Sequence, residues 1–177
     1  NKLSTFPQLI DAIDSLGDTQ GAEVERLDPL FSADDDFAEF KTRHDQEVVP
    51  KGKLDGYTGR VFIGIDAGST TMKAALVGED GQLLHTWYGN NNGDILGTAK
   101  VIMADFYNHI PAGCTIGHVT TTGYGEALLI EALKADSGEI ETVAHLRGAK
   151  AFLPGVEFIL DIGGQDMKCL RVKDGVI

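Results

Sequence analysis

The chain has 177 residues, of which 42% are hydrophobic and 24% are charged, and its formal net charge is −12. This hydrophobic content supports a packed core, and the length allows one full domain with room for part of another. The acidic balance and the absence of a basic stripe argue against nucleic acid and against an anionic membrane surface as partners.

The sequence contains no apolar run typical of a transmembrane helix and no signal peptide, so we expect a cytoplasmic protein without membrane contact. The two cysteines, Cys114 and Cys169, have neither disulfide nor metal-ligand spacing. Cys114 directly precedes an expected strand and Cys169 falls in one, and we therefore predict two buried free thiols.

Residues 1–60 differ from the rest of the chain, and we expect them to form a partly helical connector. Apolar residues at helical spacing predict a first helix over Phe6–Leu16. Three consecutive aspartates then predict the start of a second helix that ends near His44. Three consecutive side chains do not face one way, so a helix start is favoured over a metal site for these aspartates.

From residue 61 the apolar pattern becomes regular. The expected strands are Val61–Ile65, Met72–Val77, Leu83–Tyr88, Thr115–Thr121, Val156–Asp161 and Met167–Val172. The expected helices begin after Asp94, after Gly125 and near Glu141, and the last of them ends near Phe152. The order β-β-β-α-β-α-α-β followed by a hairpin predicts an α/β fold with a ribonuclease-H-like mixed sheet and flanking helices.

We expect three segments along the chain. After the connector, residues 61–154 form the ribonuclease-H-like first subdomain, and residues 155–177 form the first hairpin of a truncated second subdomain, with the boundary near Pro154. The chain begins with Asn and stops in what reads as a fresh strand, so we expect a fragment of a longer protein.

The most informative motif is the run GIDAGSTTMK at residues 64–73. A short apolar strand delivers Asp66 to the edge of the sheet, where ligands bind in open α/β sheets. Gly68 lets the backbone approach a phosphate, and the hydroxyl residues Ser69, Thr70 and Thr71 follow before Lys73. This order of residues is typical of a phosphate-binding hairpin.

The run DIGGQDMK at residues 161–168 has a similar order of residue types: an aspartate after an apolar strand, then glycines, an amide and a lysine. Neither run is a Walker loop or a G-x-G-x-x-G dinucleotide fingerprint. Either turn alone would be interpreted as ordinary turn chemistry. Two such turns in one chain favour a split nucleotide-phosphate site.

These two motifs, with TTGYG at 121–125 and AHLRGA at 144–149, make the chain resemble the actin, heat-shock chaperone and sugar-kinase ATPase superfamily. More narrowly, residues 61–177 resemble the activator ATPases of 2-hydroxyacyl-CoA dehydratases and their benzoyl-CoA reductase relatives. Residues 1–60 are similar to the connector before the second module of large tandem-module activases. The resemblance implies a Mg-dependent ATPase in the whole protein, and leaves open whether this fragment is itself active.

The resemblance also implies roles for individual residues. The expected phosphate- and nucleotide-binding residues are Gly68, Ser69, Thr70, Thr71, Gly123, Gly163 and Gly164. Lys73 would supply a point charge beside the phosphates. Asp66 would hold Mg²⁺ through water, and Asp161 would be a second such ligand or would orient the attacking water. Gln165 would also position water.

The resemblance implies ATP and Mg²⁺ as cofactors, a 2-hydroxyacyl-CoA dehydratase-type enzyme as partner, and a possible homodimer. The single-module relatives hold a [4Fe–4S] cluster between two subunits, but no residue of this chain matches the cluster ligands, and Cys169 follows the second motif too closely. A small-molecule kinase of the same superfamily and a non-catalytic regulatory module remain the alternatives. His145, on an expected helix, is interpreted as a packing or capping residue.

Overall fold

A computed structural model describes residues 5–16 and 27–177 of the chain. The chain divides into two units, residues 1–48 and residues 49–177. In the described part of the chain, no helix has the length and the apolar character needed to cross a membrane.

The first unit contains both helices that the sequence predicts for it, α1 (Phe6–Leu16) and α2 (Asp34–His44). The aspartates do start α2, and the Asp36 carboxylate accepts hydrogen bonds from the backbone N–H groups of Ser32 and Ala33. Lysine, arginine and histidine occupy the last turn of α2, so both ends complement the helix dipole. The acidic triplet is thus accounted for by local helix structure.

The second unit is built on a five-stranded mixed sheet with the strand order β3-β2-β1-β4-β5. Its strands are β1 (Gly59–Ala67), β2 (Thr71–Gly78), β3 (Leu83–Asn90), β4 (Cys114–Thr122) and β5 (Ser137–Gly138). The β1–β2 and β2–β3 pairs are antiparallel, whereas β4 runs parallel to both β1 and β5. The predicted mixed sheet is confirmed. Strand β5 was not among the expected strands, because its two residues are too few to show an alternating pattern.

The core lies on one face of this sheet. Alternate residues of β1, namely Val61, Ile63, Ile65 and Ala67, are buried there. Helices α3 (Ile95–His109) and α4 (Glu126–Leu133) cover this face with the buried side chains Ile102, Phe106 and Leu129. As predicted, Asp94 caps α3, and its carboxylate accepts a hydrogen bond from the Gly97 N–H.

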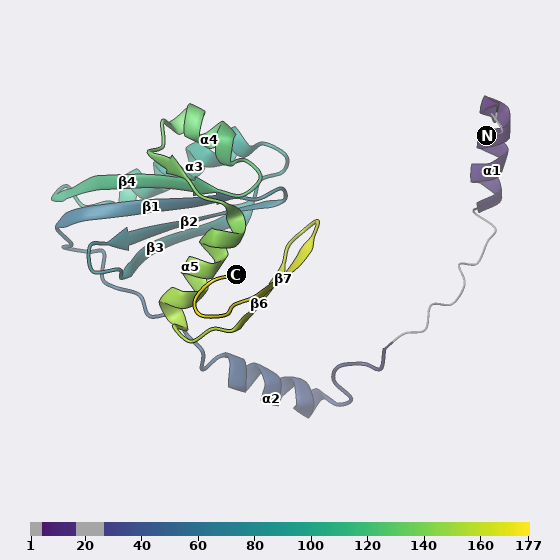
Figure 1. The fold of residues 1–177 in the computed structure, drawn as a ribbon, viewed down its shortest axis with the longest axis horizontal. Helices are drawn as coiled ribbons and strands as arrows, with labels where there is room; N and C mark the ends of the chain where they lie inside the picture. Colours follow the sequence, from purple (N-terminus) through teal and green to yellow (C-terminus); the bar gives the residue numbers. More distant parts are fainter. Residues whose placement is uncertain (1–4, 17–26) are drawn as a thin grey trace. The chain divides into compact units, whose positions relative to one another are not determined.

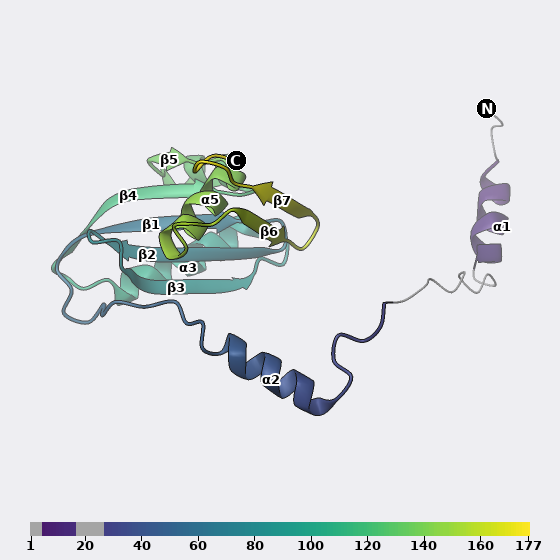
Figure 2. The same cartoon turned by 60° about the horizontal axis from the view of Figure 1, so that its bottom comes forward.

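Helix α5 (Glu141–Phe152) lies on the opposite face of the sheet from α3 (Figure 2). The hairpin of β6 (Phe158–Ile162) and β7 (Met167–Arg171) follows it as a separate two-stranded sheet. Figure 1 shows this hairpin in yellow beside α5, near the end of the main sheet where β1 turns into β2. The arrangement brings the two glycine-containing turns to the same side of the unit.

The two cysteines differ from each other in burial. Cys114 at the start of β4 is half-buried, and its thiol donates a hydrogen bond to the Tyr57 carbonyl at 3.3 Å. Cys169 in β7 is exposed, so the prediction of a buried thiol is wrong there. It pairs with Leu160 on a face of the hairpin whose residues are exposed along both strands.

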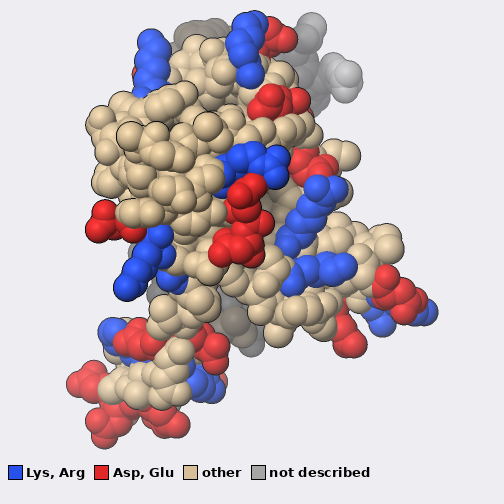
Figure 3. All heavy atoms as spheres, turned by 90° about the vertical axis from the view of Figure 1, so that its left-hand side faces the viewer, with Lys and Arg blue, Asp and Glu red and all other residues tan. Residues whose placement is uncertain are grey.

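Charged side chains of both signs lie close together over the surface shown in Figure 3. The chain as a whole carries a net charge of −12, so its overall electrostatic field does not attract anions. An anionic ligand has to be held by local donors and by individual lysines.

Candidate nucleotide-phosphate site

The first hairpin places Asp66 and Lys73 directly opposite each other in the β1–β2 ladder. Lys73 Nζ lies 3.3 Å from Asp66 Oδ2, so the lysine is paired with the aspartate at the mouth of the turn. Gly68 opens the turn, and a Cβ atom there would lie 2.6 Å from the Thr71 carbonyl oxygen. Only glycine therefore fits this turn without movement of the backbone, as the motif indicated.

A residue that the sequence analysis assigned only to a loop braces this turn. Asn91 is 2% exposed, and its side-chain amide donates a hydrogen bond to the Gly68 carbonyl at 2.8 Å. Its own backbone N–H donates to the Thr70 carbonyl at 2.9 Å. Both ends of the turn are thus fixed from the loop after β3. The run of three asparagines in the sequence did not reveal which of them would be buried.

The second hairpin repeats the register of the first. Asp161 in β6 pairs with Lys168 in β7, as Asp66 pairs with Lys73. In both hairpins one further pair of residues separates the aspartate–lysine pair from the turn. The two motifs therefore form equivalent structures, in which a carboxylate and an ammonium group flank a glycine-containing turn.

The two turns face each other across a pocket of about 90 Å³. Their close approach is evident at Gly164, where a Cβ atom would lie 2.5 Å from Thr70 Oγ1. Nine of the expected site residues line the pocket: Asp66, Gly68, Ser69, Thr70, Thr71, Lys73, Asp161, Gly163 and Gly164. Residues from hairpins about a hundred positions apart in the chain thus meet at one polar pocket.

Two expected site residues do not line this pocket. Gln165 is exposed at the tip of the second turn. Gly123 lies behind Asp66 instead, with a φ of +84°, and a Cβ atom there would be 2.5 Å from Asp66 Oδ1. The glycine is required at this position because it lets the loop after β4 pass close to the Asp66 carboxylate.

The carboxylates of the pocket have unmet hydrogen-bonding capacity. Asp66 Oδ1 is buried and has no hydrogen-bond partner among the described residues. A buried polar atom without a partner is costly, and such atoms in native proteins commonly serve a ligand or an ordered water. Together with Asp161 on the facing hairpin, Asp66 offers carboxylate oxygens as metal ligands, and such oxygens suit a hydrated Mg²⁺ ion.

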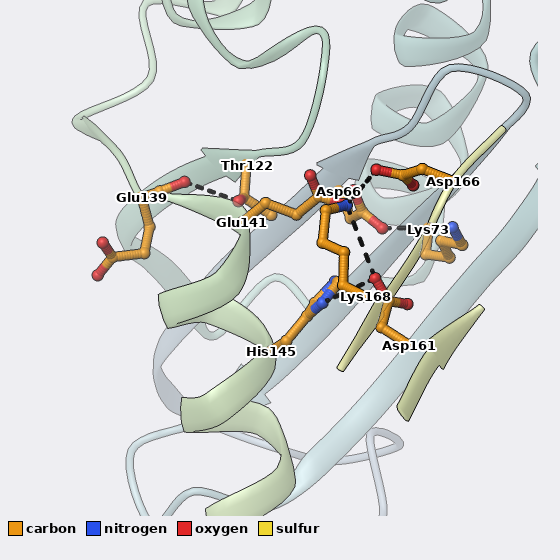
Figure 4. A network of polar contacts seen from close by, with 9 residues as sticks. All are labelled: Asp66, Lys73, Thr122, Glu139, Glu141, His145, Asp161, Asp166 and Lys168. Carbon is orange, nitrogen blue, oxygen red and sulfur yellow. Dashed lines mark hydrogen bonds and ion pairs between the residues drawn. The ribbon is translucent and has the colours of Figure 1, made fainter. Parts of the chain in front are cut away.

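Lys168 connects the second hairpin with helix α5. Its Nζ lies 2.8 Å from Asp166, 3.4 Å from Glu141 and 3.9 Å from Asp161, as Figure 4 shows for the two aspartates. The hydrogen bond to Asp166, together with the charge of Glu141, raises the pKa of the Lys168 ammonium above its ordinary value, although partial desolvation opposes this. Lys168 is therefore a fixed positive charge beside the pocket at neutral pH.

Helix α5 contributes two residues that the sequence analysis left outside the site. Glu141 and His145 lie one helical turn apart, and both line the pocket. His145 Nδ1 lies 3.4 Å from Asp161 Oδ2 and, although buried, makes no hydrogen bond among the described residues. The available signal was the i,i+4 spacing of an acid and an imidazole on the helix that precedes the second motif.

A second pocket, of about 830 Å³, lies between the sheet and α5 and shares Asp66 and Lys73 with the first. Its other lining residues include Trp87, Tyr88 and Phe152, and most of its surface is apolar. Phosphate groups need convergent polar donors, so the smaller, polar pocket between the two turns is the candidate for phosphate binding.

A family model described as the BadF/BadG/BcrA/BcrD ATPase family matches residues 63–176, which include both hairpins. The chain belongs to this family. The expected resemblance to the activators of 2-hydroxyacyl-CoA dehydratases is confirmed by individual relatives. The (R)-2-hydroxyglutaryl-CoA dehydratase activating ATPase of Acidaminococcus fermentans is 30% identical over 115 residues, covering 65% of this chain and 44% of the relative.

A protein of Methanocaldococcus jannaschii, called uncharacterized protein MJ0800, is 32% identical over 138 residues, covering 74% of this chain and 31% of that protein. Among solved structures, component A of the Acidaminococcus fermentans (R)-2-hydroxyglutaryl-CoA dehydratase is similar, with a TM-score of 0.58 and 29% identity. That match covers 66% of this chain and 44% of the solved one.

The activator of the 2-hydroxyisocaproyl-CoA dehydratase from Clostridium difficile, solved with bound ADPNP, has a TM-score of 0.55 and 25% identity. It is covered over 43% of its length, and this chain over 66%. This member of the BadF/BadG/BcrA/BcrD ATPase family therefore spans less than half of the activators it resembles. The predicted fold class, an α/β mixed sheet with flanking helices as in the first part of an actin-like ATPase, is confirmed.

Proposed function

We propose that the chain is the phosphate-binding part of an ATPase module in a protein that activates a 2-hydroxyacyl-CoA dehydratase or a related CoA-ester enzyme. The observation that carries this proposal is the pair of equivalent aspartate–lysine hairpins facing each other across one polar pocket. Two such turns, on separate sheets, supply donors to opposite sides of a phosphate chain. Family membership gives the nucleotide as ATP.

In this proposal the first turn binds the terminal phosphates. The backbone N–H groups from Gly68 to Thr71 and the hydroxyl groups of this turn donate to phosphate oxygens. Gly163 and Gly164 let the second turn approach from the other side. Lys73 exchanges its contact with Asp66 for one with the phosphates, because its side chain already lines the pocket between the two turns.

Asp66 and Asp161 would hold Mg²⁺ through water molecules, and the orphaned Asp66 Oδ1 supports this assignment. When bound, the ion supplies charge neutralisation for the phosphate oxygens. The residues of the chain do the rest: Asp161 orients the attacking water, and His145 holds the Asp161 carboxylate in place from α5. Glu141 lines the same pocket and would help to orient the attacking water, whereas Gln165 is exposed at the tip of the second turn.

We propose three segments in the chain: a connector over residues 1–60, a ribonuclease-H-like subdomain over 61–154, and the opening hairpin of a second subdomain over 155–177. Binding of a [4Fe–4S] cluster, a dimeric state and contact with the dehydratase are assigned to the whole protein. Cys114 and Cys169 are not proposed as cluster ligands, because they lie singly on different sheets without cluster spacing.

The test is steady-state phosphate release from Mg-ATP by the whole protein. Asp66→Ala and Asp161→Ala should each lower turnover by about a hundredfold or more, because each removes a charge that acts in the transition state. Lys73→Ala should also lower turnover. Asp80→Ala is the matched control, since Asp80 occupies the β2–β3 turn at the other end of the sheet and accepts a hydrogen bond from the Gln82 N–H.

Turnover within a few-fold of wild type in Asp161→Ala would show that the second hairpin has no such role. Transfer of the phosphoryl group to a sugar or an organic acid, in place of release to water, would favour a kinase.

A further inference from the structure

A second cluster of ionisable side chains lies away from the phosphate pocket, on the face of the sheet that α3 covers. His85 comes from β3, the outer strand of the sheet, and Asp105 and His109 come from one turn of α3. One potential ligand atom from each residue lies within 4.8 Å of those of the other two. The phosphate-site proposal makes no use of these residues.

The Asp105 carboxylate bridges the two imidazoles. Its Oδ2 lies 2.7 Å from His85 Nε2, and its Oδ1 lies 3.5 Å from His109 Nδ1. The two imidazole rings are stacked with their centroids 4.4 Å apart. The three side chains are therefore close enough to converge on one small ion, and the His109 ring would turn to present its Nε2 atom.

The hydrogen bonds of the cluster determine which nitrogen atoms are available. His109 Nδ1 lies 2.7 Å from the Asp105 backbone carbonyl, and a carbonyl only accepts, so Nδ1 carries the proton and Nε2 carries the lone pair. Metal-binding histidines usually donate their other ring N–H to a carbonyl or carboxylate in this way. His85 shares its Nε2 proton with Asp105, and a cation would replace that proton.

The surroundings hold the strand side of the cluster in place and leave the helix side open. The His85 ring packs edge-on against the buried Phe106 ring at 5.3 Å, which fixes its orientation. The side chains of His85, Asp105 and His109 are 24%, 29% and 50% exposed. A fourth coordination position would therefore face solvent and could be filled by water.

We propose that His85, Asp105 and His109 form a binding site for a borderline divalent transition-metal cation, with Zn²⁺ as its representative. Two imidazoles and one carboxylate suit Zn²⁺, Ni²⁺ or Co²⁺ better than Mg²⁺ or Ca²⁺, which prefer oxygen ligands alone. A bound ion would link the outer strand to α3. The site is independent of the nucleotide site, which lies between the hairpin turns and α5 on the other side of the sheet.

The experiment is equilibrium dialysis of the chelator-treated chain against micromolar Zn²⁺, with bound metal measured by atomic emission, followed by a Co²⁺ absorption titration. The wild-type chain should bind one Zn²⁺ ion. The affinity for this ion should be at least tenfold lower in both Asp105→Asn and His109→Gln. These two residues are partly exposed, so the variants should fold even if His85→Gln does not.

Two controls keep the result specific. His118→Gln removes another partly exposed imidazole that lies near a carboxylate, Asp136, outside the cluster. Asp161→Asn disables the nucleotide pocket, where Glu141, His145 and Asp161 form a separate group of possible ligands. Both variants should retain the Zn²⁺. The proposal is overturned if wild type binds none at micromolar concentration, or if Asp105→Asn and His109→Gln bind as wild type does.

Discussion

His145 Nδ1 lies 3.4 Å from Asp161 Oδ2, so helix α5 contacts the carboxylate of the second hairpin directly (Figure 4). Asp161 is thereby approached from two sides, by His145 and, at 3.9 Å, by Lys168. A carboxylate in contact with neighbouring side chains on two sides has fewer orientations to lose when it takes up its working position. His145 is therefore a positioning residue in the proposed ATPase.

His145→Ala should lower the turnover number of the whole protein by about tenfold, the range typical of residues that orient a ligand through another group. KM for ATP should change little, because His145 does not belong to either phosphate-binding turn. His145→Asn should recover part of the loss, since its amide nitrogen stands the same number of bonds from the backbone as His145 Nδ1. The measurement is steady-state phosphate release.

His118→Ala is the control for removal of a partly exposed imidazole near an aspartate, and it should retain full activity. Equal losses in His145→Ala and His145→Asn, accompanied by a lower melting temperature in both, would indicate packing alone and contradict the positioning role.

Gly123→Ala tests the close approach of the loop after β4 to Asp66. The glycine has a φ of +84°, and an added Cβ would lie 2.5 Å from Asp66 Oδ1 and 3.0 Å from the Ala67 backbone. We expect a loss of about 1–3 kcal/mol in the free energy of unfolding from the strained backbone, and a further loss of turnover because Asp66 is displaced. Chemical denaturation and phosphate release measure the two effects.

Gly81→Ala is a closely matched control. Gly81 has a φ of +80°, and a Cβ atom added there would have nothing within 4 Å, so the variant carries the same backbone strain without the contact. It should lose stability but keep its turnover number. Similar turnover in both variants would show that contact between Gly123 and Asp66 does not matter for activity.

Particular residues explain how far the sequence could be interpreted. The strands β1 and β2 were predictable because each is a short apolar run beside turn residues, and the phosphate motifs were predictable because an aspartate, then glycine, then a lysine follow in the same order in both. His145 was interpreted as a packing or capping residue because a lone histidine on a helix usually is one. Glu141 was missed because an acid in the first turn of a helix is also typical of ordinary helix starts. Asn91 was missed because burial of one asparagine among three depends on tertiary packing.

The failed prediction for Cys169 has a related cause. A strand was correctly expected, but strand position alone does not say whether both faces are covered, and β7 belongs to a two-stranded sheet with one exposed face. The pairing of Asp161 with Lys168 depended only on the local turn, and it follows from the motif itself. The pairing of residues within the hairpin could thus be predicted from the sequence, whereas the contacts of the hairpin with the rest of the unit could not.

The raised pKa of Lys168 leads to a prediction about alkaline pH. A lysine whose pKa is higher in the folded than in the unfolded state stabilises the fold fully below its ordinary pKa of 10.5, and loses that contribution as the pH rises through the folded value. Asp166→Asn removes the largest cause of the shift. The variant should therefore be less stable than wild type at pH 8. The difference in the free energy of unfolding should shrink at a pH high enough for Lys168 to lose its proton in wild type.

Urea denaturation of both proteins at pH 8 and at pH 11.5 measures this difference, and titration of the Lys168 side chain by NMR measures the pKa directly. Asp174→Asn, in the turn after β7, controls for the loss of one negative charge. A stability difference that is the same at both pH values would contradict the role of Asp166.

Asn91→Ala tests the brace that holds the first phosphate turn. Asn91 is 2% exposed, donates through its side chain to Gly68, and accepts a hydrogen bond from the Gly93 N–H at 2.9 Å. Alanine leaves the Gly68 carbonyl without its partner, so we expect a loss of about 1–3 kcal/mol in the free energy of unfolding. The turn should also become less well held, which would raise KM for Mg-ATP in the whole protein.

Asn108→Ala, an exposed position on α3, is the matched control and should change neither quantity. Hydrogen exchange adds a local measurement, because the Asn91 N–H donates to the Thr70 carbonyl and reports directly on the turn. Faster exchange at residue 91 in the variant, together with a raised KM, is the expected result. A stability loss with unchanged exchange and unchanged KM would mean that Asn91 supports only the loop after β3, and that the phosphate turn keeps its shape without it.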